Sequence, residues 1–219
     1  MLSWFLLDDE RRPELEPFEE ADYAIPSALC ERFIAQYSEP GEVVFDPFAG
    51  FGTVIDAAQR MGRRGVGIEL DADRFAHARS IVRPPAMILR GDALEIAIED
   101  VPPIDLLVTS PPYWDPEGDA FAAYEAPDAG YEHHLNLWER LLARWKPRLR
   151  DGARVVVFVQ NVLLPEARQP LYPLAWDLGR LLSRSLRFEG EWIACATRSA
   201  ATSKRYGDHT YCLVARHIV

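Results

Sequence analysis

Short runs of consecutive apolar residues alternate along this chain with longer segments whose apolar residues recur every three or four positions. The short runs predict seven strands, at 42–48, 64–70, 86–92, 105–112, 153–161, 190–197 and 210–216. The longer segments predict five helices, at 26–38, 52–62, 71–82, 131–146 and 171–185. Strands that are apolar throughout and separated by helices are typical of a parallel sheet covered on both faces.

The connection between the last two predicted strands, at 198–209, is too short to hold a crossover helix. We therefore expect those two strands to pair antiparallel. The predicted fold class is α/β, a single-domain Rossmann-like arrangement with a seven-stranded, mostly parallel sheet and an antiparallel last strand. Ligands of such sheets bind at the carboxyl ends of the strands, near the point where the strand order reverses.

Composition narrows the class of protein. With 219 residues, of which 48% are hydrophobic, the chain can bury the core of one domain. Its longest apolar runs, such as 155–159, are too short to cross a bilayer, and its first residues lack the basic start of a signal peptide. Cys30, Cys195 and Cys212 form neither a disulfide framework nor a metal-ligand spacing. We expect a cytoplasmic protein without a metal site.

The charge of the chain is acidic and unevenly distributed. A net charge of −10 argues against unaided binding to nucleic acid. Residues 1–22 hold eight of the acids against two arginines. We therefore expect an acidic N-terminal arm at 1–22, followed by one domain at 23–219.

The stretch DPFAGFGT, at 46–53, follows the first predicted strand and leads into a helix. Gly50 and Gly52 remove side chains where the backbone must approach a ligand, and the helix that starts near Thr53 directs its amides toward that ligand. A dinucleotide-binding turn needs a third glycine, but Ile55 stands at that position. This turn is therefore expected to hold a small molecule without a pyrophosphate.

Acidic residues end the next two predicted strands. Glu69, in GIEL, stands where a carboxylate accepts hydrogen bonds from the hydroxyls of a ribose. Asp92, in GDA, stands where it can accept from the amino group of an adenine. A ribose, an adenine and a glycine turn without a pyrophosphate socket together indicate S-adenosylmethionine.

The stretch TSPPYWD, at 109–115, ends the fourth predicted strand. The hydroxyl of Ser110 and the carbonyl of Pro111 can accept hydrogen bonds from an exocyclic amine, which favours a pyramidal nitrogen with a free lone pair. Pro111 and Pro112 restrict the backbone. Tyr113 offers a ring on which a base taken out of the helix can stack.

With this motif, the chain resembles the S-adenosylmethionine-dependent DNA amino-methyltransferases, which methylate N4 of cytosine or N6 of adenine. SPPY matches their hallmark motif, and DPFAGFGT, GIELD and GDA match their cofactor motifs. The resemblance covers nearly all of the chain after residue 22, implies a class I methyltransferase fold, and favours N4 of cytosine. It implies catalytic roles for Ser110, Pro111, Pro112 and Tyr113. The cofactor-binding residues that it implies are Ile25, Pro26, Asp46, Phe48, Ala49, Gly50, Gly52, Thr53, Glu69, Leu70, Asp92, Ala93 and Ser110.

The chain departs from this family's pattern in its substrate-reading parts. Family members usually carry a separate segment that reads the target sequence, whereas here only the loops at 114–131 and 198–209 are long. We expect Trp114, Arg198, Lys204 and Arg205 to contact nucleic acid. The recognised target sequence is then short, or a homodimer or partner subunit supplies the recognition. His133 and His134 are expected to cap a helix or face solvent, and the role of His209 is left open.

Three alternatives stay open at this point. The acceptor could be an RNA base or a protein glutamine amide, because related folds methylate both with similar motifs. The chain could also be a non-catalytic methyltransferase-like subunit of a larger complex, although its intact acidic residues and Ser110 argue against this. Methylation at a ring carbon is disfavoured because none of the three cysteines follows a proline or ends the fourth strand.

Overall fold

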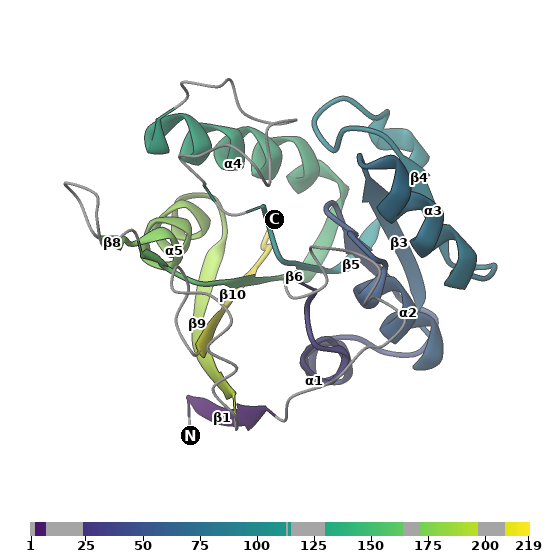
Figure 1. The fold of residues 1–219 in the computed structure, drawn as a ribbon, viewed down its shortest axis with the longest axis horizontal. Helices are drawn as coiled ribbons and strands as arrows, with labels where there is room; N and C mark the ends of the chain where they lie inside the picture. The colour runs from purple at the N-terminus through teal and green to yellow at the C-terminus, as the bar shows by residue number, and fades with distance from the viewer. Residues whose placement is uncertain (1–2, 8–23, 113, 115–129, 164–170, 197–208) are drawn as a thin grey trace.

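The computed structural model describes residues 3–7, 24–112, 114, 130–163, 171–196 and 209–219. Eight of the strands form one sheet in the order β1-β9-β10-β6-β5-β2-β3-β4 (Figure 1). These strands are β1 (Trp4–Leu7), β2 (Val43–Asp46), β3 (Arg64–Glu69), β4 (Met87–Arg90), β5 (Ile104–Thr109), β6 (Leu149–Val159), β9 (Arg187–Ala196) and β10 (His209–Arg216). The short strands β7 (Val162–Leu163) and β8 (Leu171–Tyr172) form a separate pair.

Helices cover both faces of this sheet. Buried side chains of α4 and α5 pack on one face, and those of α1, α2 and α3 pack on the other (Figure 1). The helices are α1 (Ser27–Tyr37), α2 (Thr53–Arg60), α3 (Ala72–Ile81), α4 (Tyr131–Trp145) and α5 (Leu174–Ser185), with 3-10 turns η3 (Ile98–Asp100) and η4 (Lys146–Arg148). All five predicted helices and all seven predicted strands are present, which confirms the α/β fold class.

Strand directions also follow the prediction. β2 pairs in parallel with β3 and β5, while β4 and β6 extend the parallel sheet on either side. The last strand, β10, runs antiparallel to both of its neighbours, β6 and β9. An eighth strand, β1, pairs in parallel with β9, and its residues fall within the segment expected to be an acidic arm. The boundary between an arm at 1–22 and a domain at 23–219 stays a prediction.

The first crossover packs unusually closely, and glycines in β3 make this possible. A Cβ atom on Gly65 would lie 2.8 Å from Cγ2 of Ile55, and one on Gly67 would lie 2.8 Å from Cβ of Ala49. In a dinucleotide-binding turn, the third glycine gives the helix its close approach to the strand. Here Ile55 occupies that position, and the missing side chains of β3 provide the space instead.

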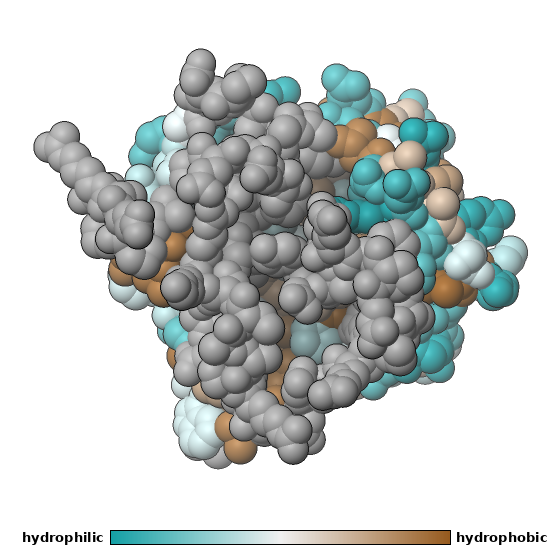
Figure 2. Space-filling view, in the orientation of Figure 1, coloured by the Kyte–Doolittle hydropathy of each residue, from teal (hydrophilic) through white to brown (hydrophobic). Residues whose placement is uncertain are grey.

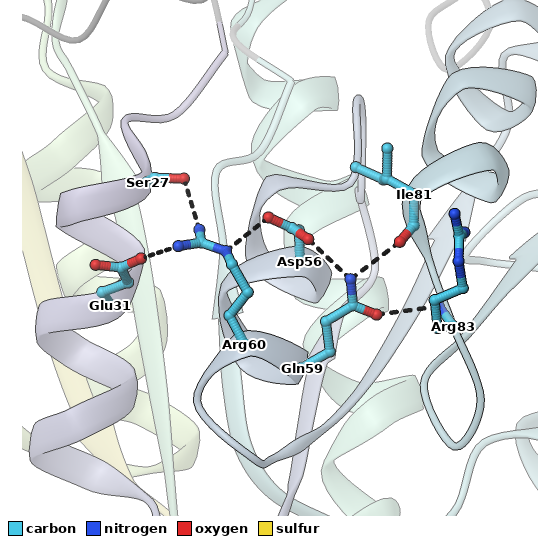
Figure 3. Close-up of polar contacts among 7 residues, drawn as sticks. All are labelled: Ser27, Glu31, Asp56, Gln59, Arg60, Ile81 and Arg83. Carbon is cyan, nitrogen blue, oxygen red and sulfur yellow. Dashed lines mark hydrogen bonds and ion pairs between the residues drawn. The ribbon is translucent and has the colours of Figure 1, made fainter.

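A polar network holds the three helices of this face together (Figure 3). Arg60, near the end of α2, contacts Glu31 of α1 at 2.5 Å and Asp56 at 2.8 Å. Gln59 donates to the Ile81 carbonyl at 3.0 Å and accepts from the Arg83 amide at 3.0 Å. Because α2 starts at the glycine turn, these contacts fix the helix that carries the turn.

The outer surface of α3 is polar, and Ala78 is its one buried residue. Hydrophilic side chains predominate over this helix on the right of the space-filling view (Figure 2). Among the described residues, no helix combines the length and the apolar character needed to span a membrane.

We predict that Gly67→Ala destabilises the fold by about 1–3 kcal/mol, because the new methyl group would overlap Ala49 and Ile55. Gly179→Ala, within helix α5, is the matched control, since its Cβ would lie at an ordinary contact distance of 3.9 Å from the Phe188 ring. That control should raise the free energy of unfolding by about 0.5–1 kcal/mol. Urea unfolding measures both, and a Gly67→Ala protein as stable as wild type would contradict the packing argument.

Candidate active site

The residues predicted to form the site end four neighbouring strands of the sheet. Asp46 ends β2, Glu69 ends β3, Asp92 follows β4, and Ser110 follows β5. These strands are adjacent in the order β5-β2-β3-β4 and run in parallel, so their carboxyl ends share one edge. The predicted residues are thereby brought to one side of the molecule.

The glycine turn between β2 and α2 adopts a backbone that requires glycine. Gly50 has φ 53° and Gly52 has φ 85°, both in the left-handed region. A Cβ on Gly52 would also lie 3.0 Å from Cβ of Ala78 in α3. Phe48, Ala49 and Thr53 complete the turn, and the Ala49 amide donates to the Ile68 carbonyl of β3 at 2.8 Å.

Glu69 closes this turn from the neighbouring strand. Its Oε2 accepts from the Gly50 amide at 2.7 Å, and its Oε1 accepts from the Asp71 amide at 2.8 Å. The side chain is 7% exposed, and burial raises its pKa, while the two amides oppose that rise. Each carboxylate oxygen has two lone pairs, so Glu69 can hold the turn and still accept from a ribose hydroxyl.

Asp46 is a fully buried acid beneath the same turn. Its Oδ1 accepts from the Phe48 amide at 3.0 Å and from the Thr109 hydroxyl at 2.7 Å. Its Oδ2 has no hydrogen-bond partner among the described residues. Burial raises the pKa of Asp46 to about 7, and the charge of Glu69 adds to the rise. A cation above the turn would favour the ionised form.

Thr109 connects this acid to the Ser-Pro-Pro run. Because Thr109 ends β5 and its hydroxyl binds Asp46, the next residue, Ser110, starts directly beside the end of β2. Pro111 and Pro112 are buried, whereas Ser110 is partly exposed. Tyr113 lies outside the described residues. Thr109 stands within the TSPPYWD motif, but the sequence alone predicts no role for it. Its hydrogen bond to Asp46 joins two strands that are distant along the chain.

The remaining predicted cofactor residues lie just after β3 and β4 or just before α1. Asp92 accepts from the Leu94 amide at 2.7 Å, and the buried Ala93 accepts from Nε1 of Trp145 at 3.1 Å. Ile25 and Pro26 directly precede α1, and all three of Ile25, Pro26 and Leu70 are partly exposed.

Of the four residues predicted to contact nucleic acid, the structure describes only Trp114. Arg198, Lys204 and Arg205 lie outside the described residues, so their role stays a prediction. Trp114 is 5% exposed and packs against two tyrosine rings, so the structure does not present it to a duplex.

The histidines flanking this region also differ from one another. His133 is exposed, in line with the solvent-facing alternative of the two roles expected for the pair. His134 is buried at 4% exposure, which differs from that alternative. The His209 ring stacks edge-on against Tyr211, with 4.9 Å between centroids.

Comparison with known proteins finds similarity to one family over part of the chain. Residues 4–80, which include the glycine turn and Glu69, match the family described as DNA methylase. This segment of the chain is thus similar to DNA methylases. The resemblance found in the motifs is confirmed over this part of the chain.

Two curated proteins are similar to this chain over a short segment. Type II methyltransferase M.HpaI of Haemophilus parainfluenzae is 37% identical over 54 residues, covering 25% of this chain and 17% of that protein. Type II methyltransferase M2.DpnII of Streptococcus pneumoniae is 39% identical over 54 residues, covering 25% of this chain and 20% of that protein. The matches therefore span about a fifth of those proteins' length.

Solved structures match the fold over most of the chain. A TehB-like SAM-dependent methyltransferase from Corynebacterium glutamicum superposes with a TM-score of 0.55 at 18% identity, covering 88% of each chain. At this identity the likeness shows the fold, a Rossmann-like methyltransferase fold as predicted.

S-adenosylmethionine, the cofactor of the DNA methylase family, fits the residues present. The cofactor carries a sulfonium and an α-ammonium group, and two buried carboxylates underlie the turn. The unpaired Oδ2 of Asp46 supplies a negative charge without a counter-charge of its own. The site therefore suits a cation with a ribose.

We predict that S-adenosylmethionine binds more tightly as pH rises from 5.5 to 7.5. Asp46 loses its proton near pH 7, and only the carboxylate attracts the positive ligand. This range lies below about 7.7–8.0, where an ordinary α-amino group loses its own proton. Affinity should rise at most about tenfold per pH unit below the pKa and level off above it.

The matched variant is Asp46→Asn, which keeps the shape and removes the titration. Calorimetric titrations across the same pH range should give the variant a flatter profile than wild type. Equal slopes in the two proteins would contradict the role given to Asp46.

Proposed function

We propose that this protein transfers a methyl group from S-adenosylmethionine to the exocyclic amine of a DNA base, with N4 of cytosine favoured over N6 of adenine. The observation that carries the proposal is the hydrogen bond between Thr109 and Asp46 at 2.7 Å. It joins the end of the strand that bears the Ser-Pro-Pro run to the acid beneath the glycine turn. A methyl donor over the turn and an amine at Ser110 would then be neighbours.

Each part of the edge has a task in this reaction. Glu69 accepts from the ribose hydroxyls, Asp92 accepts from the adenine amino group, and Asp46 balances the positive charge of the cofactor. When bound, S-adenosylmethionine supplies an electrophilic methyl group. These roles give acceptors to the ribose hydroxyls and to the adenine amino group, which would otherwise be buried unpaired.

The acceptor side of the site must make a poor nucleophile reactive. The lone pair of an exocyclic amine is delocalised into the ring, and acceptors placed at its two hydrogens favour a pyramidal nitrogen. We assign these acceptors to the Ser110 hydroxyl and the Pro111 carbonyl. As the N–C bond to the methyl group forms, the S–C bond of the sulfonium would break and S-adenosylhomocysteine would leave with the electron pair. The nitrogen would then carry the positive charge and release one proton to solvent past these acceptors.

A DNA base is favoured as the acceptor because the family match is to DNA methylases, and both curated relatives are type II methyltransferases by name. The preference for cytosine rests on a serine at the first motif position and on the YW that follows the prolines. A homodimer or a partner subunit that supplies sequence recognition remains part of the proposal.

The experiment that tests the function offers three acceptors in parallel. Purified protein is incubated with tritiated S-adenosylmethionine and unmethylated DNA, RNA or protein, and the labelled product is hydrolysed and separated. The proposal expects label in N4-methylcytosine from DNA. Label in N6-methyladenine would correct the base, label in RNA or glutamine would correct the substrate, and no label in any arm would overturn the function.

We predict that Ser110→Ala lowers kcat by about 10²–10⁴-fold, as expected when an acid–base partner of the amine is lost. The fall in kcat should be far larger than any fall in cofactor affinity, because Ser110 acts on the amine. Ser183→Ala is the control, since Ser183 lies exposed on α5 and its hydroxyl donates to the Arg180 carbonyl of the same helix at 2.8 Å. Loss of cofactor binding with retained turnover would contradict this role.

A further inference from the structure

Three aromatic rings meet directly after the Ser-Pro-Pro run. The ring of Trp114 lies 4.3 Å from that of Tyr172 and 5.5 Å from that of Tyr131, centroid to centroid. The two tyrosine rings lie 5.2 Å apart. At these distances the rings pack against one another, which adds to the stability of the contact beyond the area buried. Trp114 is 5% exposed within this cluster.

The two tyrosines come from elements that are themselves fixed to the core. Tyr131 starts α4, and its hydroxyl donates to Oδ2 of Asp177 in α5 at 2.8 Å. Tyr172 lies in β8, where it pairs with the buried Val162 of β7. Both tyrosines also pack against the main core on the α4–α5 face of the sheet. The cluster therefore holds Trp114 between the first residue of α4 and strand β8, which precedes α5.

Trp114 is held by its ring and not by a hydrogen bond. Its Nε1 is buried and has no acceptor among the described residues. An unpaired buried donor adds nothing to the stability of a contact, so packing of the indole accounts for its position.

The Ser-Pro-Pro run is thus fixed at both ends. At one end, the Thr109 hydroxyl binds Asp46 at 2.7 Å. At the other end, Trp114 sits among the tyrosine rings, and the intervening Pro111 and Pro112 restrict the backbone further. Acceptors that must meet the two hydrogens of one amine need such a rigid support, because a displacement of about 1 Å can cost 10²-fold in rate.

We propose that Trp114 is a positioning residue, which together with Tyr131 and Tyr172 holds Ser110 and Pro111 in place for methyl transfer. This inference rests on the proposed function. It replaces the expectation that Trp114 contacts nucleic acid, because a ring enclosed by two tyrosines is withdrawn from the substrate.

The test compares removal of the ring with removal of its N–H group. Trp114→Ala and Tyr172→Ala each remove one ring, and the double variant removes both. Trp114→Phe and Tyr172→Phe keep an aromatic ring. Trp192→Ala is the control, because Trp192 is a partly buried tryptophan that packs on the opposite, α1–α3 face of the sheet.

Steady-state kinetics and hydrogen exchange are measured for every variant. We expect Trp114→Ala and Tyr172→Ala to lower kcat by about 10–100-fold, with the KM for S-adenosylmethionine and for DNA unchanged. The double variant should be no slower than the worse single variant, because both rings support one run. Both Phe variants should retain turnover near the wild-type rate. Trp192→Ala should lose stability without this loss of kcat.

Hydrogen exchange distinguishes failure of this inference from failure of the proposed function. Amides in 105–114 should exchange faster in Trp114→Ala than in wild type, and at the wild-type rate in Trp192→Ala. A wild-type protein that transfers no methyl group would overturn the proposed function. Even then, the exchange rates of the amides in 105–114 would test whether Trp114 holds the Ser-Pro-Pro run in place. A raised KM for DNA with unchanged kcat in Trp114→Ala, or unchanged exchange in 105–114, would overturn the positioning role.

Discussion

The hydrogen bond from the Gly50 amide to the Glu69 carboxylate, at 2.7 Å, fixes the position of the glycine turn on the sheet. It joins the loop that leaves β2 to the end of β3. It forms only because Gly65 and Gly67 let α2 and Ala49 approach β3 closely. The glycine turn, the start of α2 and the contact of Gly52 with Ala78 all follow from this approach.

The electrostatics of the edge depend on the same arrangement. Two acids that end adjacent strands are almost fully buried, and burial raises the pKa of each. The fold bears the cost of these desolvated carboxylates, and a positive ligand offsets it. Two of the carboxylates that give the chain its net charge of −10 thus lie beneath the candidate cofactor site. The negative charge, which disfavours binding to nucleic acid, thereby favours binding of a cationic cofactor.

The sequence was sufficient to predict the main elements and the residues of the shared edge. Apolar runs such as VVVFV, and the apolar residues that recur every three or four positions in α4, can be recognised from local periodicity. Acids at the ends of adjacent strands lie together whenever the strands are parallel. Contacts between segments far apart in the sequence were beyond reach. The strand at Trp4–Leu7 exists through its pairing with β9, and its four residues leave too short a pattern to recognise. The hydrogen bond from Thr109 to Asp46 and the packing of Trp114 against Tyr172 also join segments that are far apart in the sequence.

Isothermal calorimetry of S-adenosylmethionine binding to wild type and Glu69→Ala tests the central claim most directly. The account predicts one cofactor per chain in wild type. It predicts binding weaker by about 1–3 kcal/mol in the variant, the cost of leaving the ribose hydroxyls and the Gly50 amide without an acceptor. Circular dichroism establishes that the variant is folded, and Glu39→Ala, at an exposed residue, serves as the control. A folded Glu69→Ala protein that binds S-adenosylmethionine as tightly as wild type would contradict the account.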